Sequence, residues 1–131
     1  MSNLQLHVTQ GTLKKSSEIL GKMDNYVLVR LHSGGKTNDY KSTIVPGAAK
    51  EKPITWNYTF NIPISQAQRD ARLEVWVKDE DMTKDDINGK GWVNVERCGM
   101  FNGRGSYQLR LHGDNKKQEH AGDLYFTTNY S

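Results

Sequence analysis

Apolar and polar residues alternate along most of this chain, and no segment repeats apolar residues at the spacing of a helix. In the first segment, Leu4, Leu6 and Val8 alternate with polar neighbours, which is typical of a strand with one buried face. The alternation and the turn residues between segments predict eight strands, at Leu4–Thr9, Tyr26–Leu31, Lys41–Val45, Thr55–Ile62, Arg72–Val77, Gly91–Val95, Ser106–Leu111 and Asp123–Thr128. A single helical turn is predicted at Ser65–Asp70.

Eight short strands, each starting roughly 10–17 residues after the previous one ends and joined by loops rich in Gly, Asn and Asp, predict an all-β fold, an antiparallel β-sandwich. We expect one domain over residues 1–131. The longest unbroken apolar run, Tyr26–Val29, has four residues, whereas a membrane-spanning helix needs about 20. The first residues lack the basic and apolar regions of a secretory signal, and Cys98 has no second cysteine with which to pair. These features favour a cytoplasmic location.

The net charge of +3 conceals an uneven distribution. Residues 79–86, DEDMTKDD, hold five carboxylates and one lysine, so this segment carries a charge of −4. The rest of the chain has 17 basic and 10 acidic side chains, a net charge of +7. Carboxylates this close repel one another unless cations or solvent screen them. The segment is therefore either a solvated loop or part of a cation site.

The composition of the acidic segment favours calcium over other metals. Asp79 and Asp81 are two residues apart, so both side chains point to the same side of an extended backbone. Calcium accepts six to eight oxygen ligands in loose geometry, whereas zinc prefers nitrogen and sulfur ligands, which the segment lacks. An EF-hand is excluded because Lys84 and Lys90 occupy the positions of its glycine and its last glutamate.

Three motifs, each beside a predicted strand, carry a resemblance to a known family. They are Asp24-Asn25-Tyr26-Val27 before the second strand, Pro53-Ile54-Thr55-Trp56-Asn57-Tyr58-Thr59-Phe60 at the fourth, and Asp79, Asp81 and Asp86 ahead of Gly89. In this order they resemble the C2 domain family. The resemblance implies an eight-stranded sandwich of the variant in which the edge strand comes last, as in phospholipase C and many plant members.

The resemblance also implies calcium as a cofactor, held between the first and third loops at one end of the sandwich. Asp24, Asp79 and Asp81 match ligand positions directly, and Glu18 stands in the place of a first-loop aspartate. Asp86 matches the last ligand by its distance from Gly89, with Asp85 as a competing assignment. Four apolar residues near these ligands are candidates for lipid contact, or alternatively pack against the sandwich: Ile19, Leu20, Met23 and Met82.

The function implied is that of a calcium-dependent module that binds anionic phospholipid, and thus becomes peripheral to the membrane when calcium is present. Some C2 domains also bind phosphoinositide headgroups through a lysine-rich patch. The corresponding residues here form either such a patch or an ordinary solvated surface: Arg30, Lys36, Lys41, Lys50 and Lys52. Nucleic-acid binding is not expected, because the chain shows neither a recognition helix nor an RNA-stacking signature.

Catalysis has no support in the sequence. The four histidines are scattered without metal spacing, and Cys98 has no histidine nearby in the sequence to activate it. We therefore expect a protein that is not an enzyme. The alternative to calcium-dependent membrane binding is a calcium-independent C2-like structural or protein-interaction adaptor.

Overall fold

The computed structural model describes residues 2–14, 24–46, 53–80, 86–113 and 119–131. Most of these residues lie in strands, and the described residues include no helix long and apolar enough to cross a membrane. The elements are β1 (Asn3–Leu13), β2 (Asp24–Ser33), β3 (Lys36–Lys41), β4 (Val45–Pro46), β5 (Ile54–Pro63), β6 (Arg72–Asp79), β7 (Asp86–Asn94), the short 3₁₀ turn η1 (Met100–Asn102), β8 (Arg104–His112) and β9 (His120–Tyr130).

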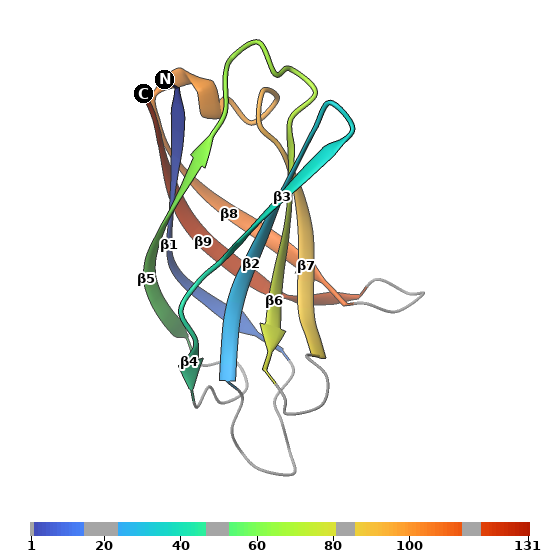
Figure 1. Ribbon diagram of the computed structural model, residues 1–131. Coiled ribbons are helices and arrows are strands. Elements are labelled where there is room, and N and C mark those ends of the chain that lie inside the picture. The colour runs from blue at the N-terminus through green and yellow to red at the C-terminus, as the bar shows by residue number, and fades with distance from the viewer. Residues whose placement is uncertain (1, 15–23, 47–52, 81–85, 114–118) are drawn as a thin grey trace.

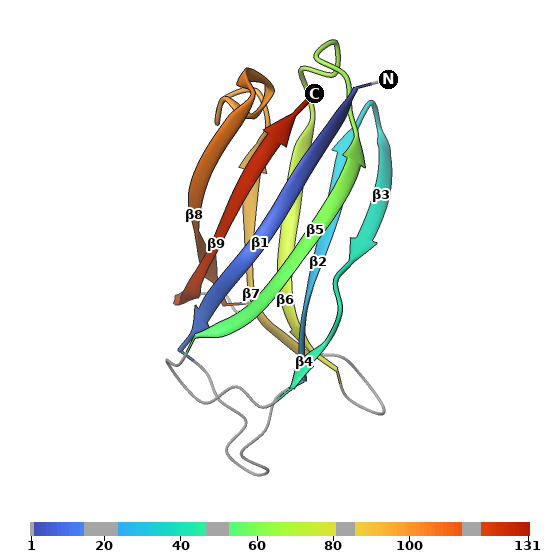
Figure 2. The same cartoon turned by 90° about the vertical axis from the view of Figure 1, so that its left-hand side faces the viewer.

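The strands pack as two antiparallel layers, which confirms the predicted sandwich (Figure 1). One layer has the order β3-β2-β6-β7, with the short β4 pairing to β2, and the other has the order β8-β9-β1-β5. Figure 2 shows the second layer from its outer side. The layers meet at one side, where β7 pairs with β8 through Lys90 and His112.

The alternation seen in the sequence builds the core between the layers. β2 turns Val27 and Val29 inward, and its neighbour β6 turns Leu73 and Val75 to the same side, all at most 1% exposed. The facing layer contributes apolar residues in the same way, because side chains of a strand point alternately to opposite faces. Its core residues include Leu4, Leu6 and Val8 of β1, Trp56, Phe60 and Ile62 of β5, Leu111 of β8, and Leu124 and Phe126 of β9.

Two local predictions are wrong. The segment Lys41–Val45 is not one strand: Lys41 ends β3, Val45 begins β4, and residues 42–44 connect them. In this connection the Ser42 hydroxyl accepts a hydrogen bond from the backbone N–H of Val27 at 2.8 Å. Ser65–Asp70 contains turns instead of a helix, since the Gln68 side chain accepts a bond from the Ser65 N–H at 2.8 Å. The 3₁₀ turn η1, which was not predicted, lies before β8.

The closing strand comes last, as expected, but it is not an edge strand. β9 lies between β8 and β1, and the two ends of the chain are adjacent, with the Asn3 N–H 2.8 Å from the Ser131 carbonyl oxygen. The start of β9 runs so close to β1 that a Cβ at Gly122 would collide with the Thr12 carbonyl oxygen. Gly122 also has a φ of 155°, which other residues rarely adopt, so both the backbone conformation and the close contact require glycine. Pairing on both sides makes β9 an inner strand.

Candidate functional site

Acidic residues of three neighbouring strands meet at one end of the sandwich, the lower end in Figure 1. β2 begins at Asp24, β6 ends at Asp79 and β7 begins at Asp86. The strand register places Asp79 opposite Asn25 on one side and opposite Asp86 on the other. We call this group, together with Glu80, the acidic rim.

Hydrogen bonds fix two members of the acidic rim to each other. The backbone N–H of Asp24 donates to Oδ1 of Asp79 at 2.9 Å, and the backbone N–H of Glu80 donates to the carbonyl oxygen of Asp24 at 2.9 Å. Asp24 and Glu80 are exposed, and Asp79 is partly buried. Nζ of Lys41 lies 3.5 Å from Oε2 of Glu80, so one cation already partly balances this end. The carboxylate of Asp79 is thus held at the strand end, beside Asp24.

A buried amide pair, which sequence reasoning missed, supports the acidic rim from beneath. Asn25 is fully buried, and its Oδ1 accepts a hydrogen bond from Nδ2 of Asn88 on β7 at 2.8 Å. The carbonyl oxygen of Asn25 accepts a bond from Nε1 of Trp56 on β5 at 3.3 Å. Asn25 therefore ties β2 to β7 and to the opposite layer directly below the rim. A polar residue at an inward position of a strand is the signal that could have found it.

Several candidate residues lie outside the described part of the chain. These are the proposed ligands Glu18, Asp81 and Asp85, the side chain of Asp86, the apolar residues Ile19, Leu20, Met23 and Met82, and the basic residues Lys50 and Lys52. Among the described residues, no three acidic, histidine or cysteine side chains gather closely enough to hold a metal. The described donors, Asp24 and Asp79, offer only oxygen, which suits a hard cation such as Ca²⁺.

The outer face of β3-β2-β6-β7 gathers cations over aromatic rings. The guanidinium of Arg30 lies 5.0 Å and Nζ of Lys78 lies 5.5 Å from the ring of Trp76. Nζ of Lys41 lies 4.2 Å from the ring of Tyr26. The rings of Tyr26 and Trp76 are buried by this packing, although both belong to the outer face. Cations in such positions are attracted by the electron-rich faces of the rings.

The same face continues toward the opposite end of the sandwich. The guanidinium of Arg72 lies 4.9 Å from the ring of Trp92, and the ring of His32 lies 5.1 Å from it. His32 in turn contacts Glu74, with Nε2 3.0 Å from Oε1. Trp92 keeps 45% of its surface exposed. We call the outer face of β3-β2-β6-β7, with its cations and aromatic rings, the basic sheet face.

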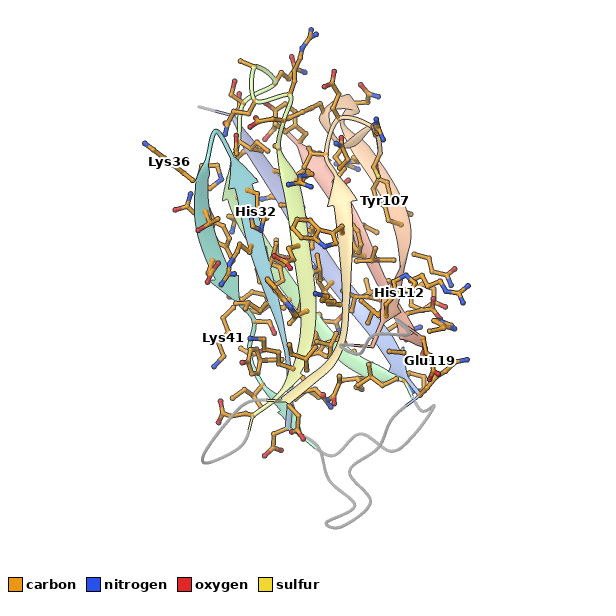
Figure 3. The ribbon with its side chains drawn as sticks, turned by 90° about the vertical axis from the view of Figure 1, so that its right-hand side faces the viewer. His32, Lys36, Lys41, Tyr107, His112 and Glu119 are labelled. Atoms are coloured by element: carbon orange, nitrogen blue, oxygen red, sulfur yellow. The ribbon has the colours of Figure 1, made fainter. Side chains whose placement is uncertain are left out.

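The structure separates the residues of the predicted basic patch. Arg30 and Lys41 share the basic sheet face, but Lys36 lies at the far end of β3 from Lys41 (Figure 3). Arg30 is also paired with Asp39, with Nε 2.6 Å from Oδ1 and Nη2 3.0 Å from Oδ2. The hydrogen bonds from Arg30 lower the pKa of Asp39, so this carboxylate stays charged and offsets part of the positive face.

Sequence reasoning missed the cations contributed by β6 and β7. Arg72 and Lys78 share one side of β6 with Trp76, and this alternation is visible in the sequence RLEVWVK. Lys90 is paired with Trp76 across the β6–β7 ladder. The sequence alone did not give the strand order, and Arg30 lies next to Trp76 only because β2 and β6 are neighbours in the sheet.

Comparisons with known proteins agree with this architecture. The model of the C2 domain family matches residues 2–111 of the chain. A comparison with curated proteins gave no matching sequence.

Solved structures share the fold over nearly the whole chain. The C2 domain A of plant Extended Synaptotagmin 1 superposes with a TM-score of 0.80 at 17% sequence identity. The match covers 99% of this chain and 94% of that one. Human GIVD cytosolic phospholipase A2, in complex with an inhibitor and terbium chloride, has a TM-score of 0.74 and 20% identity, covering 98% of this chain and 17% of its own. The structure of the paired C2 domains, A and B, of Extended-Synaptotagmin 2 has a TM-score of 0.63 and 21% identity, covering 98% of this chain and 40% of its own.

Proposed function

This chain belongs to the C2 domain family, whose members commonly bind membranes and lipids, and we propose that it is a calcium-dependent phospholipid-binding module. The observation that carries the proposal is the hydrogen bond from the Asp24 N–H to the Asp79 carboxylate. This contact joins the start of β2 to the end of β6, so carboxylates far apart in the sequence lie at one end of the sandwich.

The proposed ligands are Asp24 and Asp79, together with Glu18, Asp81 and Asp86, for which Asp85 is the competing assignment. Carboxylates this close repel one another, and a bound cation relieves that repulsion. When bound, Ca²⁺ supplies positive charge and open coordination positions that lipid phosphate oxygens can fill. Without it, the acidic rim repels an anionic membrane surface, which carries a negative potential.

The positions of these residues determine which end of the molecule would contact the membrane. Strands β2, β6 and β7 hold the acidic rim at one end, and the buried Asn25–Asn88 hydrogen bond links β2 to β7 beneath it. In this proposal Ile19, Leu20, Met23 and Met82 insert apolar surface at the same end, at about 25 cal/mol for each Å² removed from water. The protein would act at the cytoplasmic side of a membrane.

Calorimetry and vesicle pelleting test the proposal together. The full chain is titrated with Ca²⁺, and is then pelleted with vesicles of phosphatidylcholine and phosphatidylserine with and without millimolar Ca²⁺. We expect heat on titration and calcium-dependent pelleting. The double variant Asp24→Asn, Asp79→Asn should lose both, because the amide side chain keeps the hydrogen-bond acceptor of Asp79 while removing the charges.

A matched control lies at the other end of the molecule. Asp70 accepts hydrogen bonds from the Ser33 hydroxyl and from the Gly34 N–H, beside the β2–β3 hairpin. Asp70→Asn removes one charge there and should leave both calcium binding and pelleting unchanged. Absence of calcium heat, together with pelleting that ignores calcium and the double variant, would overturn the proposal in favour of the calcium-independent adaptor.

A second candidate function rests on the basic sheet face. Lys41 and Lys78 border the acidic rim and lie over aromatic rings, so the cations are ordered before any ligand arrives. Such a face would bind the phosphates of an anionic headgroup without calcium. Lys41→Gln with Lys78→Gln should weaken the affinity for phosphoinositide vesicles in a calcium chelator by about 30-fold, since each lysine near a charged surface contributes about 1 kcal/mol. Unchanged pelleting would exclude this second function.

A further inference from the structure

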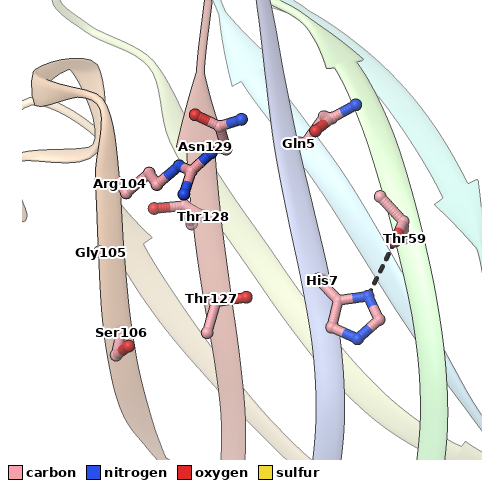
Figure 4. Close-up of a pocket in the computed structure, with 9 residues that line it drawn as sticks. All are labelled: Gln5, His7, Thr59, Arg104, Gly105, Ser106, Thr127, Thr128 and Asn129. Atoms are coloured by element: carbon pink, nitrogen blue, oxygen red, sulfur yellow. Dashed lines mark hydrogen bonds between the residues drawn. The ribbon is translucent and has the colours of Figure 1, made fainter.

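Polar side chains also cover part of the outer face of β8-β9-β1-β5, which faces away from the basic sheet face (Figure 2). The strand register arranges its side chains in two adjacent rows that cross the layer. One row runs through Arg104, Asn129 and Gln5, and the other runs through Ser106, Thr127, His7 and Thr59. These seven residues, which we call the polar sheet face, line a shallow depression of about 490 Å³ (Figure 4).

The depression offers hydrogen-bond donors, and none of the described residues that line it carries a carboxylate. Its lining includes two amide side chains and the hydroxyls of Thr59, Ser106 and Thr127. Nδ1 of His7 shares a hydrogen bond with the Thr59 hydroxyl at 2.8 Å, which fixes the orientation of the imidazole (Figure 4). Positive charge comes from Arg104, the first residue of β8, at the border of the array.

Arg104 differs from the arginines of the basic sheet face. Arg30 is occupied by Asp39 and lies over Trp76, and Arg72 lies over Trp92. Arg104 is exposed, and among the described residues it makes neither an ion pair nor a contact with an aromatic ring. Its guanidinium therefore keeps the planar set of donors that binds oxyanions in bidentate fashion.

We propose that the polar sheet face binds a small phosphorylated polyol, such as a sugar phosphate, in soluble form. Arg104 takes the phosphate, and the neighbouring hydroxyl, amide and imidazole groups take the hydroxyls of the ligand. A purely anionic ligand would use Arg104 alone, whereas the rows of neutral donors and acceptors match a molecule with many hydroxyl groups. The depression lies on a side of the sandwich, and Arg104 starts β8 at the end opposite the acidic rim (Figure 1). A membrane held at the rim is therefore far from it, which favours a soluble ligand over a lipid headgroup.

Chemical-shift mapping of the full chain tests this site without calcium or lipid. The probes are glucose 6-phosphate, and its two halves, glucose and inorganic phosphate. We expect saturable shifts at Gln5, His7, Ser106, Thr127 and Asn129, and an affinity for glucose 6-phosphate about tenfold or more above that for either half. Arg104→Gln should lower the affinity at least about tenfold, because a hydrogen bond to a charged group contributes about 1.5–3 kcal/mol.

Arg110→Gln provides the matched control, because Arg110 is exposed on the outer side of the same strand and the charge change is identical. It should leave the affinity unchanged. Three results would each overturn the site: no saturable shift, equal losses in the Arg104 and Arg110 variants, or shifts confined to the basic sheet face. Equal affinity for inorganic phosphate and glucose 6-phosphate would overturn the assignment to a polyol. Because no calcium is present, none of these results bears on the acidic rim.

Discussion

The two outer faces of this sandwich have the same strand geometry and opposite chemistry. On the basic sheet face, cations lie over aromatic rings, as Lys41 does over Tyr26, and Arg30 is also clamped by Asp39. On the polar sheet face, neutral side chains such as Thr127 and Gln5 stand exposed beside their neighbours, and Arg104 has no carboxylate partner among the described residues. One face is held by contacts among its own residues, and the other is open to water.

Because of this difference, we expect substitutions on the two faces to have different effects on stability and on ligand binding. Side chains of the basic sheet face are ordered by their neighbours, so a substitution there changes the packing of the fold as well as any charge presented to a ligand. Side chains of the polar sheet face make few contacts within the protein, so a substitution there should alter binding alone. The comparison thus predicts which variants unfold the protein and which leave it intact.

Trp76→Ala should have the largest effect. Trp76 is 7% exposed and underlies both Arg30 and Lys78, so its removal opens a cavity and frees two cations. We expect a loss of about 3 kcal/mol in the free energy of unfolding. Urea denaturation followed by circular dichroism measures this loss.

The matched variant for this test is on the polar sheet face. Thr127→Ala should change the free energy of unfolding by less than about 0.5 kcal/mol, because Thr127 is exposed. Trp76→Phe should retain most of the stability, since a ring remains beneath the cations. Similar losses for Trp76→Ala and Thr127→Ala would remove the distinction between the two faces.

Asn88→Ala should have the next largest effect, at the inner side of the layer that carries the basic sheet face. The substitution deprives Oδ1 of Asn25 of its donor while Asn25 stays fully buried. A buried acceptor left unpaired costs about 1–3 kcal/mol. Asn61→Ala, at an exposed asparagine of the opposite layer, should be nearly neutral in the same denaturation measurement. A neutral Asn88→Ala would mean that the amide pair does not support the rim.

The sequence was sufficient to predict the sandwich, because period-2 alternation marks inward positions directly. The strands around Val27 and Leu73 were placed correctly for this reason. The third strand was placed too late because the decisive contact, from the Val27 N–H to the Ser42 hydroxyl, joins residues that alternation does not relate. The role of β9 as an inner strand depends on the meeting of the chain ends at Asn3 and Ser131, which no local pattern encodes.

The candidate sites were predicted less completely than the fold. The family resemblance implied that the first and third loops lie together at one end of the sandwich. The contact between Asp24 and Asp79 depends on the pairing of β2 with β6, which the structure shows. The basic patch was predicted from basic residues that are close in the sequence. In the structure Lys36 lies at the other end of β3 from Lys41, whereas Lys78 of β6 lies opposite Tyr26, on the same face as Lys41. The polar sheet face was missed because its residues are ordinary one by one, and only the strand register forms them into rows.

Thr128→Val should stabilise the protein slightly, in contrast to the buried asparagines of the other layer. Thr128 is 4% exposed, and its hydroxyl oxygen has no hydrogen-bond partner among the described residues. Valine has nearly the same shape without the buried polar atom, so we expect a gain of up to about 1 kcal/mol in the free energy of unfolding. Thr127→Val, one residue earlier and exposed, should show no comparable gain. Destabilisation by Thr128→Val would mean that the hydroxyl is bonded in solution.

Asp39→Asn should have the smallest effect, and one that depends on pH. The hydrogen bonds from Arg30 lower the pKa of Asp39 in the folded protein below its usual value of about 3.9. The ionised form is therefore favoured by folding, so the ion pair stabilises the protein above about pH 4 and this contribution is lost as the pH falls through the folded pKa. Both side chains are more than one-third exposed, so the contribution should be below about 1 kcal/mol. Denaturation of the wild type and of Asp39→Asn at pH 7 and about pH 3 measures it. The difference between the two proteins should shrink in acid, and a difference that is constant with pH would show that Asp39 acts through packing and not through its charge.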